Sequence, residues 1–219
     1  WLLIAEICKA VPHLRIRLGS LEPRIVTEEF AAALSGFQNL CPQFHLSMQS
    51  GCDTVLARMK RKYTTEEYME SLERLRNAFP GCAITTDMIV GFPGETEEEF
   101  EKSLSFIRQC RFADMHIFPY SRRPGTPAAE MPGQLPNAVK EERSRRAIAV
   151  AQDMSETYRR GLIGTAQAVL VEGTEGEHSV GHAMNYVKIY IPGAYPRNEI
   201  QTVAVKSLYG DGVTGEVIQ

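Results

Sequence analysis

The sequence lacks the closely spaced cysteines that hold structural metals and iron–sulfur clusters. Its five cysteines are Cys8, Cys41, Cys52, Cys82 and Cys110, and no two of them have the CxxC spacing. We therefore expect no zinc site and no iron–sulfur cluster built by this chain alone. An odd number of scattered cysteines also argues against a disulfide framework and fits a reducing, cytoplasmic environment.

Long apolar runs and a dominant charge are missing as well. No apolar stretch approaches the roughly 20 residues that a membrane helix needs, so we expect no membrane attachment. The net charge of −3 gives no overall attraction to nucleic acid, so any RNA contact requires a local basic patch. The sequence also has no initiator methionine, and we interpret it as a fragment of a longer protein.

Four strand-like segments are present, separated by helix-like segments. They cover residues 14–20, 44–50, 83–92 and 115–121. Strand–helix repetition predicts an α/β fold with a parallel sheet. Four such units are too few to close an eight-stranded barrel, so we expect the C-terminal half of a six- or eight-unit (β/α) barrel.

Threonine and glutamate mark the starts of the connecting helices. Thr27 precedes one helix, and the pairs Thr64 with Glu67 and Thr96 with Glu99 have the spacing of a capping box. We therefore expect helices to begin directly after these three threonines.

The last third of the chain changes character. A Pro/Gly-rich segment, 122–136, predicts an exposed loop, and a long helix is expected from about 137 to 160. Short alternating strands punctuated by glycine follow, which is typical of a small antiparallel barrel of OB-like size. We expect two domains, a partial (β/α) barrel over 1–160 and the small barrel over 161–219.

Small and polar residues follow the predicted strands. In a parallel sheet these carboxyl ends meet at one edge, where ligands bind. We expect Ser20, Glu22, Gln49, Ser50 and Gly91 to hold a polar organic ligand there, and an adenosyl group suits such a site.

Each of these residues has a purely structural alternative. Ser20 and Glu22 can serve only as helix caps, and the turns 49–51 and 91–94 can exist without a ligand. Asp87, inside a strand, can be a satisfied core acid. His45 fits a core or supporting histidine better than a metal ligand.

The densest basic patch is the run RMKRKY at 58–63. We expect Arg58, Lys60, Arg61 and Lys62 to face RNA phosphates, although such a run is also typical of a solvated helix end. The segment from Arg159 onward carries five basic and six acidic side chains, which is weak electrostatics for an RNA binder acting alone.

Several longer motifs resemble one enzyme family. HLSMQSGCD at 45–53, TTDMIVGFPGETEEEF at 85–100, RIRLGSLEP at 15–23 and HIFPYSRRPGTPA at 116–128 are similar to the radical S-adenosylmethionine methylthiotransferases. The final sixty residues resemble the TRAM domain of that family. The form of HIFPYSRRPGTPA most resembles the branch that acts on N6-threonylcarbamoyladenosine in transfer RNA, with the isopentenyladenosine branch as the nearest rival.

This resemblance implies a set of partners and roles. The whole enzyme would use S-adenosylmethionine and two 4Fe-4S clusters, whose cysteine ligands lie outside this chain, and a protein reductant. It would act on transfer RNA, in the cytoplasm and as a monomer. We assign Tyr120, Arg122 and Arg123 to the substrate nucleotide and the five strand-end residues to S-adenosylmethionine. We assign no catalytic residue and no metal ligand to this chain, and expect the fragment alone to be inactive.

Two other classes of function remain open. The chain can be a non-catalytic RNA-binding module whose small barrel is the active part. It can also be a phosphate-binding barrel enzyme, although the strand ends lack a basic or helix-start phosphate motif.

Overall fold

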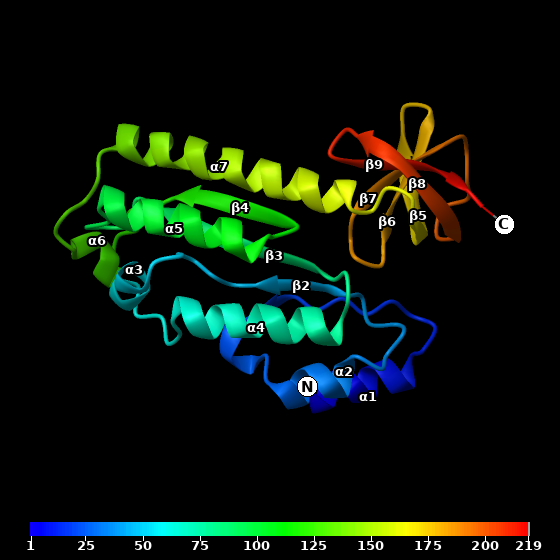
Figure 1. The fold of residues 1–219 in the computed structure, drawn as a ribbon, viewed down its shortest axis with the longest axis horizontal. Helices are drawn as coiled ribbons and strands as arrows, with labels where there is room; N and C mark the ends of the chain where they lie inside the picture. The colour runs from blue at the N-terminus through cyan, green and yellow to red at the C-terminus, as the bar shows by residue number, and fades with distance from the viewer. Residues whose placement is uncertain (219) are drawn as a thin grey trace.

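The structure is a computed structural model that describes residues 1–218, with a four-stranded sheet, its helices and a small barrel (Figure 1). The helices are α1 Leu2–Ala10, the 3-10 turn η1 Pro23–Ile25, α2 Glu28–Leu34, α3 Asp53–Arg58, α4 Thr65–Ala78, α5 Glu97–Cys110, α6 Pro127–Glu130 and α7 Asn137–Arg160. The strands are β1 Ser20–Leu21, β2 Gln43–Leu46, β3 Ala83–Val90, β4 Asp114–Pro119, β5 Ala166–Glu175, β6 His178–Ala183, β7 Lys188–Pro192, β8 Ile200–Tyr209 and β9 Gly212–Val217.

The first four strands form a parallel sheet in the order β1-β2-β3-β4. Alternation along β3 buries Ile84, Met88 and Val90 and leaves Thr85 and Asp87 partly exposed on the other face. The buried face packs under α4, α5 and α7. The predicted α/β fold with a parallel, barrel-like sheet is confirmed.

The strand predicted at 14–20 is wrong in extent. Only Ser20–Leu21 pairs along β2, and Ile16 makes a single bridge to Leu40. The arginines of this segment contact the small barrel instead. Arg15 donates to the carbonyls of β5 and β6, and the guanidinium of Arg17 lies 4.0 Å from the centre of the Tyr186 ring.

The predicted helix starts are confirmed. Thr64 and Glu67 form a complete capping box at α4, and Thr96 and Glu99 form one at α5. Thr27 accepts from the N–H of Phe30 at the start of α2. Each box satisfies two N–H groups that a helix start otherwise leaves without partners.

The C-terminal part is a closed five-stranded barrel, β5-β6-β7-β9-β8, as expected. All its pairings are antiparallel except β7 with β9, which is parallel. Its core gathers Val169, Val171, Ile189, Val203 and Val213, and no residue of this core belongs to the larger core under the sheet. Gln219, the last residue of the predicted second domain, lies outside the described residues.

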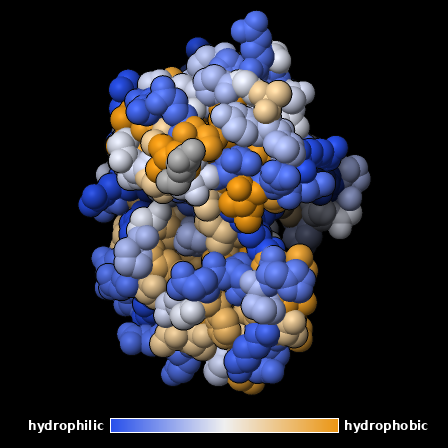
Figure 2. All heavy atoms as spheres, turned by 90° about the vertical axis from the view of Figure 1, so that its right-hand side faces the viewer, coloured by the Kyte–Doolittle hydropathy of each residue, from blue (hydrophilic) through white to orange (hydrophobic). Residues whose placement is uncertain are grey.

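The barrel sits at the amino ends of the sheet strands, away from the ends that carry α3 and α6 (Figure 1). Tyr158, near the end of α7, donates to the carbonyl of Gly81, just before β3. Figure 2 looks onto this end and shows hydrophilic side chains with small, separated apolar patches. None of the described helices is both long and apolar enough to cross a bilayer.

Candidate functional site

The carboxyl ends of β2, β3 and β4 meet at one edge of the sheet and border a groove of about 510 Å³. Its lining combines polar and apolar groups, among them Gln49, Asp87, Ile89, Phe118 and Tyr120. This volume and this mixture are typical of sites for small organic ligands.

Gln49 occupies the centre of this edge in a strained conformation. Its φ is +66°, a region that residues other than glycine rarely adopt. Its N–H donates to the carbonyl of Asp87, and its own carbonyl accepts from the N–H of Ile89, each at 2.9 Å. Because β3 uses both backbone groups, the side-chain amide is the polar group that Gln49 offers to a ligand.

A second cavity of about 330 Å³ adjoins the groove, and the two share Ile89, Tyr120, Thr126 and Ala128. Its walls are largely apolar, with Met59, Phe92 and Met131, and the basic run 58–61 lies along its side. The hydroxyl of Tyr120 is buried and makes no hydrogen bond with any described residue. Tyr120 therefore stands between a polar groove and an apolar pocket with an unused hydrogen-bonding group.

A line of polar side chains leads along the open face of the sheet to the groove. Nε2 of His45 lies 3.4 Å from the carboxylate of Asp87, and Nδ1 lies 3.1 Å from the hydroxyl of Thr85. Thr85 in turn accepts from the amide of Gln43. His45 thus supports Asp87 at the groove wall, as expected of a supporting histidine.

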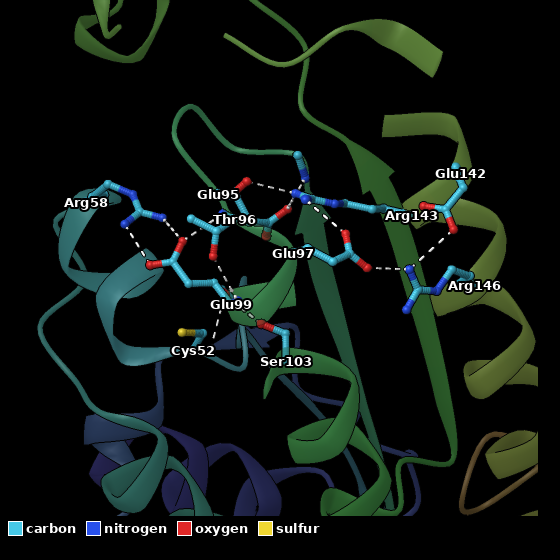
Figure 3. Close-up of polar contacts among 12 residues, drawn as sticks. Cys52, Arg58, Glu95, Thr96, Glu97, Glu99, Ser103, Glu142, Arg143 and Arg146 are labelled. Atoms are coloured by element: carbon cyan, nitrogen blue, oxygen red, sulfur yellow. Dashed lines mark hydrogen bonds and ion pairs between the residues drawn. The ribbon is translucent and has the colours of Figure 1, made fainter. Parts of the chain in front are cut away.

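Ion pairs fix the segment behind the groove (Figure 3). Arg143 of α7 donates to the carboxylate of Glu95 at 2.7 Å, and both side chains are almost fully buried. The same carboxylate oxygen accepts from the N–H of Gly91 at 2.7 Å. Burial raises the pKa of Glu95, whereas Arg143 and the Gly91 N–H favour its charged form.

A second pair joins α3 to the start of α5. The guanidinium of Arg58 makes two hydrogen bonds to Glu99, at 2.9 and 2.5 Å, and Thr54 donates to the same carboxylate. These contacts, led by Arg58, lower the pKa of Glu99 to about 2. Arg58 therefore has a structural partner, which argues against the predicted phosphate contact; Lys60, Arg61 and Lys62 are exposed.

The structure brings only part of the predicted cofactor set to the groove. Gln49 lines it, but the buried hydroxyl of Ser50 lies 3.3 Å from that of Ser103 and accepts from the N–H of Cys52. Gly91 has a φ of +71° and packs against Lys140, so the structural alternative fits this turn better than ligand contact.

The first strand end does not line the groove. Ser20 pairs with His45, which pairs with Thr85, so Ser20 lies two residues before the level of Asp87 on the groove wall, about 7 Å along the strands. Glu22 is exposed beside the 3-10 turn η1 and does not line the groove. The expected contacts of Ser20 and Glu22 with a ligand at this edge stay predictions.

Of the three residues predicted to contact the substrate, two line the groove and one does not. Tyr120 and Arg123 line the groove. Arg122 instead donates to the carbonyl of Ala129 and lies 3.8 Å from Glu130, so it holds α6 in the loop. Sequence reasoning missed Asp87 as a wall of the groove, although the alternation along β3 places it on the open face.

The cysteines do not fit an iron–sulfur cluster. All five are buried, and among residues 1–218 no group of three Cys, His, Asp or Glu side chains is placed to hold a metal. Burial raises the pKa of Cys110 and raises that of Cys82 to about 11, which opposes the thiolate form that metals require.

Comparison with known proteins shows what the chain is similar to. Residues 1–107, just under half of the chain, match the model of the radical SAM superfamily. This match supports the broad radical SAM family. A solved structure, coproporphyrinogen III oxidase of Escherichia coli, described as a radical SAM enzyme, is similar in fold with a TM-score of 0.56. It is 18% identical and covers 69% of this chain and 36% of its own, so it supports the fold alone.

Curated relatives are tRNA methylthiotransferases. The tRNA-2-methylthio-N(6)-dimethylallyladenosine synthase of Mycobacterium bovis is 48% identical over 162 residues, covering 74% of this chain and 32% of its own length. The enzyme of that name from Acidothermus cellulolyticus is 41% identical over 207 residues, covering 94% of this chain and 40% of its own. The chain thus spans about a third of the length of the curated relatives it matches.

The Arg58–Glu99 pair predicts a pH-dependent contribution to stability. A carboxylate with a lowered folded pKa stabilises the fold above its unfolded pKa, and this contribution is lost as pH falls through about 2. We expect Arg58→Leu to lower the free energy of unfolding by about 1–2 kcal/mol at pH 7, allowing for partial exposure. In urea titrations, the difference in free energy of unfolding between Arg58→Leu and the original chain should become smaller as the pH falls from 5 to 2.

Arg61→Leu is the matched control, since Arg61 is exposed in the same basic run. It should change stability little at any pH. If Arg58→Leu is as stable as the original chain at pH 7, the ion pair does not have the structural role assigned to it.

Proposed function

We propose that this chain is the part of a transfer-RNA methylthiotransferase that carries the carboxyl-edge groove, and that the enzyme modifies N6-dimethylallyladenosine. The observation that carries this proposal is the groove, in a chain that is 48% identical over 162 residues to a tRNA-2-methylthio-N(6)-dimethylallyladenosine synthase. Isopentenyladenosine is another name for dimethylallyladenosine. The names of the relatives therefore favour the isopentenyladenosine branch over the threonylcarbamoyladenosine branch that the loop motif led us to expect.

The groove suits an adenosyl ligand. Gln49 provides an amide that can both donate and accept, and Ile89 and Phe118 provide apolar surface for a base. We propose S-adenosylmethionine as this ligand; of the residues predicted to contact it, Gln49 lines the groove. The chemistry of the family also requires 4Fe-4S clusters; the residues of this chain do not fit one, so the ligands belong elsewhere in the enzyme.

Exposed cations beside the groove suit an RNA backbone. Lys60 and Arg61 lie along the apolar pocket and Arg123 lines the groove, so a nucleotide held where the pocket and the groove meet would have its phosphates near positive charge. The small barrel, proposed here as a TRAM domain, lies at the opposite end of the sheet. It would reach a different part of a long RNA.

A non-catalytic RNA-binding module remains the rival. In that alternative the small barrel would bind the RNA, but its basic and acidic side chains nearly cancel in charge, which is unfavourable for RNA binding. That alternative gives no role to the groove, to the strained Gln49 or to the Tyr120 hydroxyl, which has no hydrogen-bond partner among the described residues. The protein reductant and the monomeric state are expectations that follow from the family.

The test of the proposed function is the product. The full-length reconstituted enzyme should add a methylthio group to transfer RNA carrying dimethylallyladenosine, detected by mass spectrometry of the nucleosides. Gln49→Ala should raise the S-adenosylmethionine concentration needed for half-maximal rate about threefold to tenfold, because one neutral hydrogen bond is lost. Ser20→Ala, at a strand end that does not line the groove, should match the original enzyme. Failure to form the product with intact clusters would contradict the proposal.

The basic run makes a separate prediction about RNA binding. Replacing Lys60, Arg61 and Lys62 by Ala should weaken transfer-RNA binding and reduce the slope of log affinity against log salt by about 2–3, one phosphate contact for each cation. Fluorescence anisotropy at several salt concentrations measures this slope. An unchanged slope would leave these residues as a solvated helix end.

A further inference from the structure

The apolar pocket beside the groove is the feature that the proposed function does not yet use. Behind it lies a small core of its own, Cys52, Val55 and Phe92, separate from the core under the sheet. Met59, Tyr120, Ala128 and Met131 pack against this core and remain partly exposed at the pocket walls. Partly exposed apolar side chains that gather beside a polar groove indicate a surface that can bind an apolar group.

The pocket is built by anchored segments. The rings of Phe92 and Tyr120 meet edge to face at 5.4 Å, which fixes one wall. On the opposite side, the amide of Gln134 donates to the carbonyls of Ala128 and Met131. The N–H of Gly94 donates to the carbonyl of Gly133 and ties this loop to the turn after β3.

The pocket and the groove are continuous through Tyr120. A substrate nucleoside that lies at Tyr120, next to S-adenosylmethionine in the groove, can therefore extend a substituent into the pocket. The buried Tyr120 hydroxyl, which has no hydrogen-bond partner among the described residues, lies where the two cavities meet. Met59 and Met131 provide flexible, polarisable walls that adapt to a branched alkyl chain.

We propose that the pocket of Met59, Phe92, Ala128 and Met131 recognises the branched alkyl substituent on N6 of the substrate adenosine and so determines which modified nucleotide is accepted. This rests on the proposed function and deepens it. A threonylcarbamoyl substituent carries a carboxylate, a hydroxyl and a urea group. Lys60 and Arg61 at the side of the pocket would pair with the carboxylate, but the hydroxyl and urea groups would lose water against the apolar walls without gaining partners.

Relative affinity for three RNAs tests the proposal. The full-length enzyme is titrated with anticodon stem-loops that carry dimethylallyladenosine, threonylcarbamoyladenosine or plain adenosine at one position. Even one methylene in an apolar pocket gives roughly tenfold or greater discrimination. We therefore expect the dimethylallyl RNA to bind at least about tenfold more tightly than the plain RNA.

Two variants change the pocket in different ways. Ala128→Phe fills it without adding a polar atom, and Met131→Gln makes one wall polar. Both should reduce the preference for dimethylallyl over plain RNA to about threefold or less. Ile148→Gln, which replaces an exposed apolar residue on α7 away from the pocket, should keep the full preference. Thermal melting of each variant identifies any that fails to fold, and the other pocket variant then decides.

The outcomes separate this inference from the proposed function. If the enzyme methylthiolates dimethylallyladenosine but both pocket variants keep the preference, the pocket assignment is overturned and the function stands. If the enzyme binds threonylcarbamoyl RNA most tightly and modifies it, the pocket assignment and the proposed substrate both fail, while the methylthiotransferase class survives.

Discussion

The buried ion pair between Glu95 and Arg143 is the contact on which the groove depends. It joins the turn after β3 to the long helix α7, and the exposed fractions of the two side chains are 0% and 4%. Glu95 also accepts from the N–H of Gly91, and Arg143 also donates to the carbonyl of Glu95 and to the carboxylate of Glu97. Removing one partner would leave a buried charge unpaired, at a cost of about 3–5 kcal/mol. The position of the turn, and with it the shape of the edge, follows from this pair.

From that anchor the two sides of the sheet take different roles. The face under α4, α5 and α7 is filled by apolar side chains, and Tyr68 donates to the carbonyl of Leu46 at 2.7 Å. The open face carries Gln43, His45, Thr85 and Asp87, linked to one another and leading to Gln49. A rigid apolar layer thus supports a polar layer, and the backbone strain at Gln49 occurs where the polar layer reaches the groove.

Local chemistry made much of the fold predictable. The capping boxes at Thr64 and Thr96 and the alternation along β3 are short-range signals, and the structure confirms the elements they predict. The strand at 14–20 could not be recognised as mostly irregular, because Arg15 and Arg17 are drawn to the small barrel more than 150 residues away in sequence. The motifs also resembled two branches of one family closely, and sequence reasoning favoured the branch that the relatives' names do not support.

The candidate site was harder to predict than the fold, because a strand end does not reveal where each side chain points. Gln49 and Ser50 are adjacent, yet one lines the groove and the other is buried against Ser103. Arg58 looked like its basic neighbours but pairs with Glu99, which lies 41 residues later in the sequence. Such pairings depend on tertiary contacts that sequence spacing does not encode.

We propose that RNA is held at the carboxyl edge of the sheet and not mainly by the small barrel. The most direct measurement is photo-crosslinking of the full-length enzyme to an anticodon stem-loop with a photoreactive base next to the modified adenosine, followed by peptide mapping. This account predicts crosslinks in residues 58–62 and 118–131. Crosslinks found only in residues 166–217 would contradict it and support a binding module centred on the barrel.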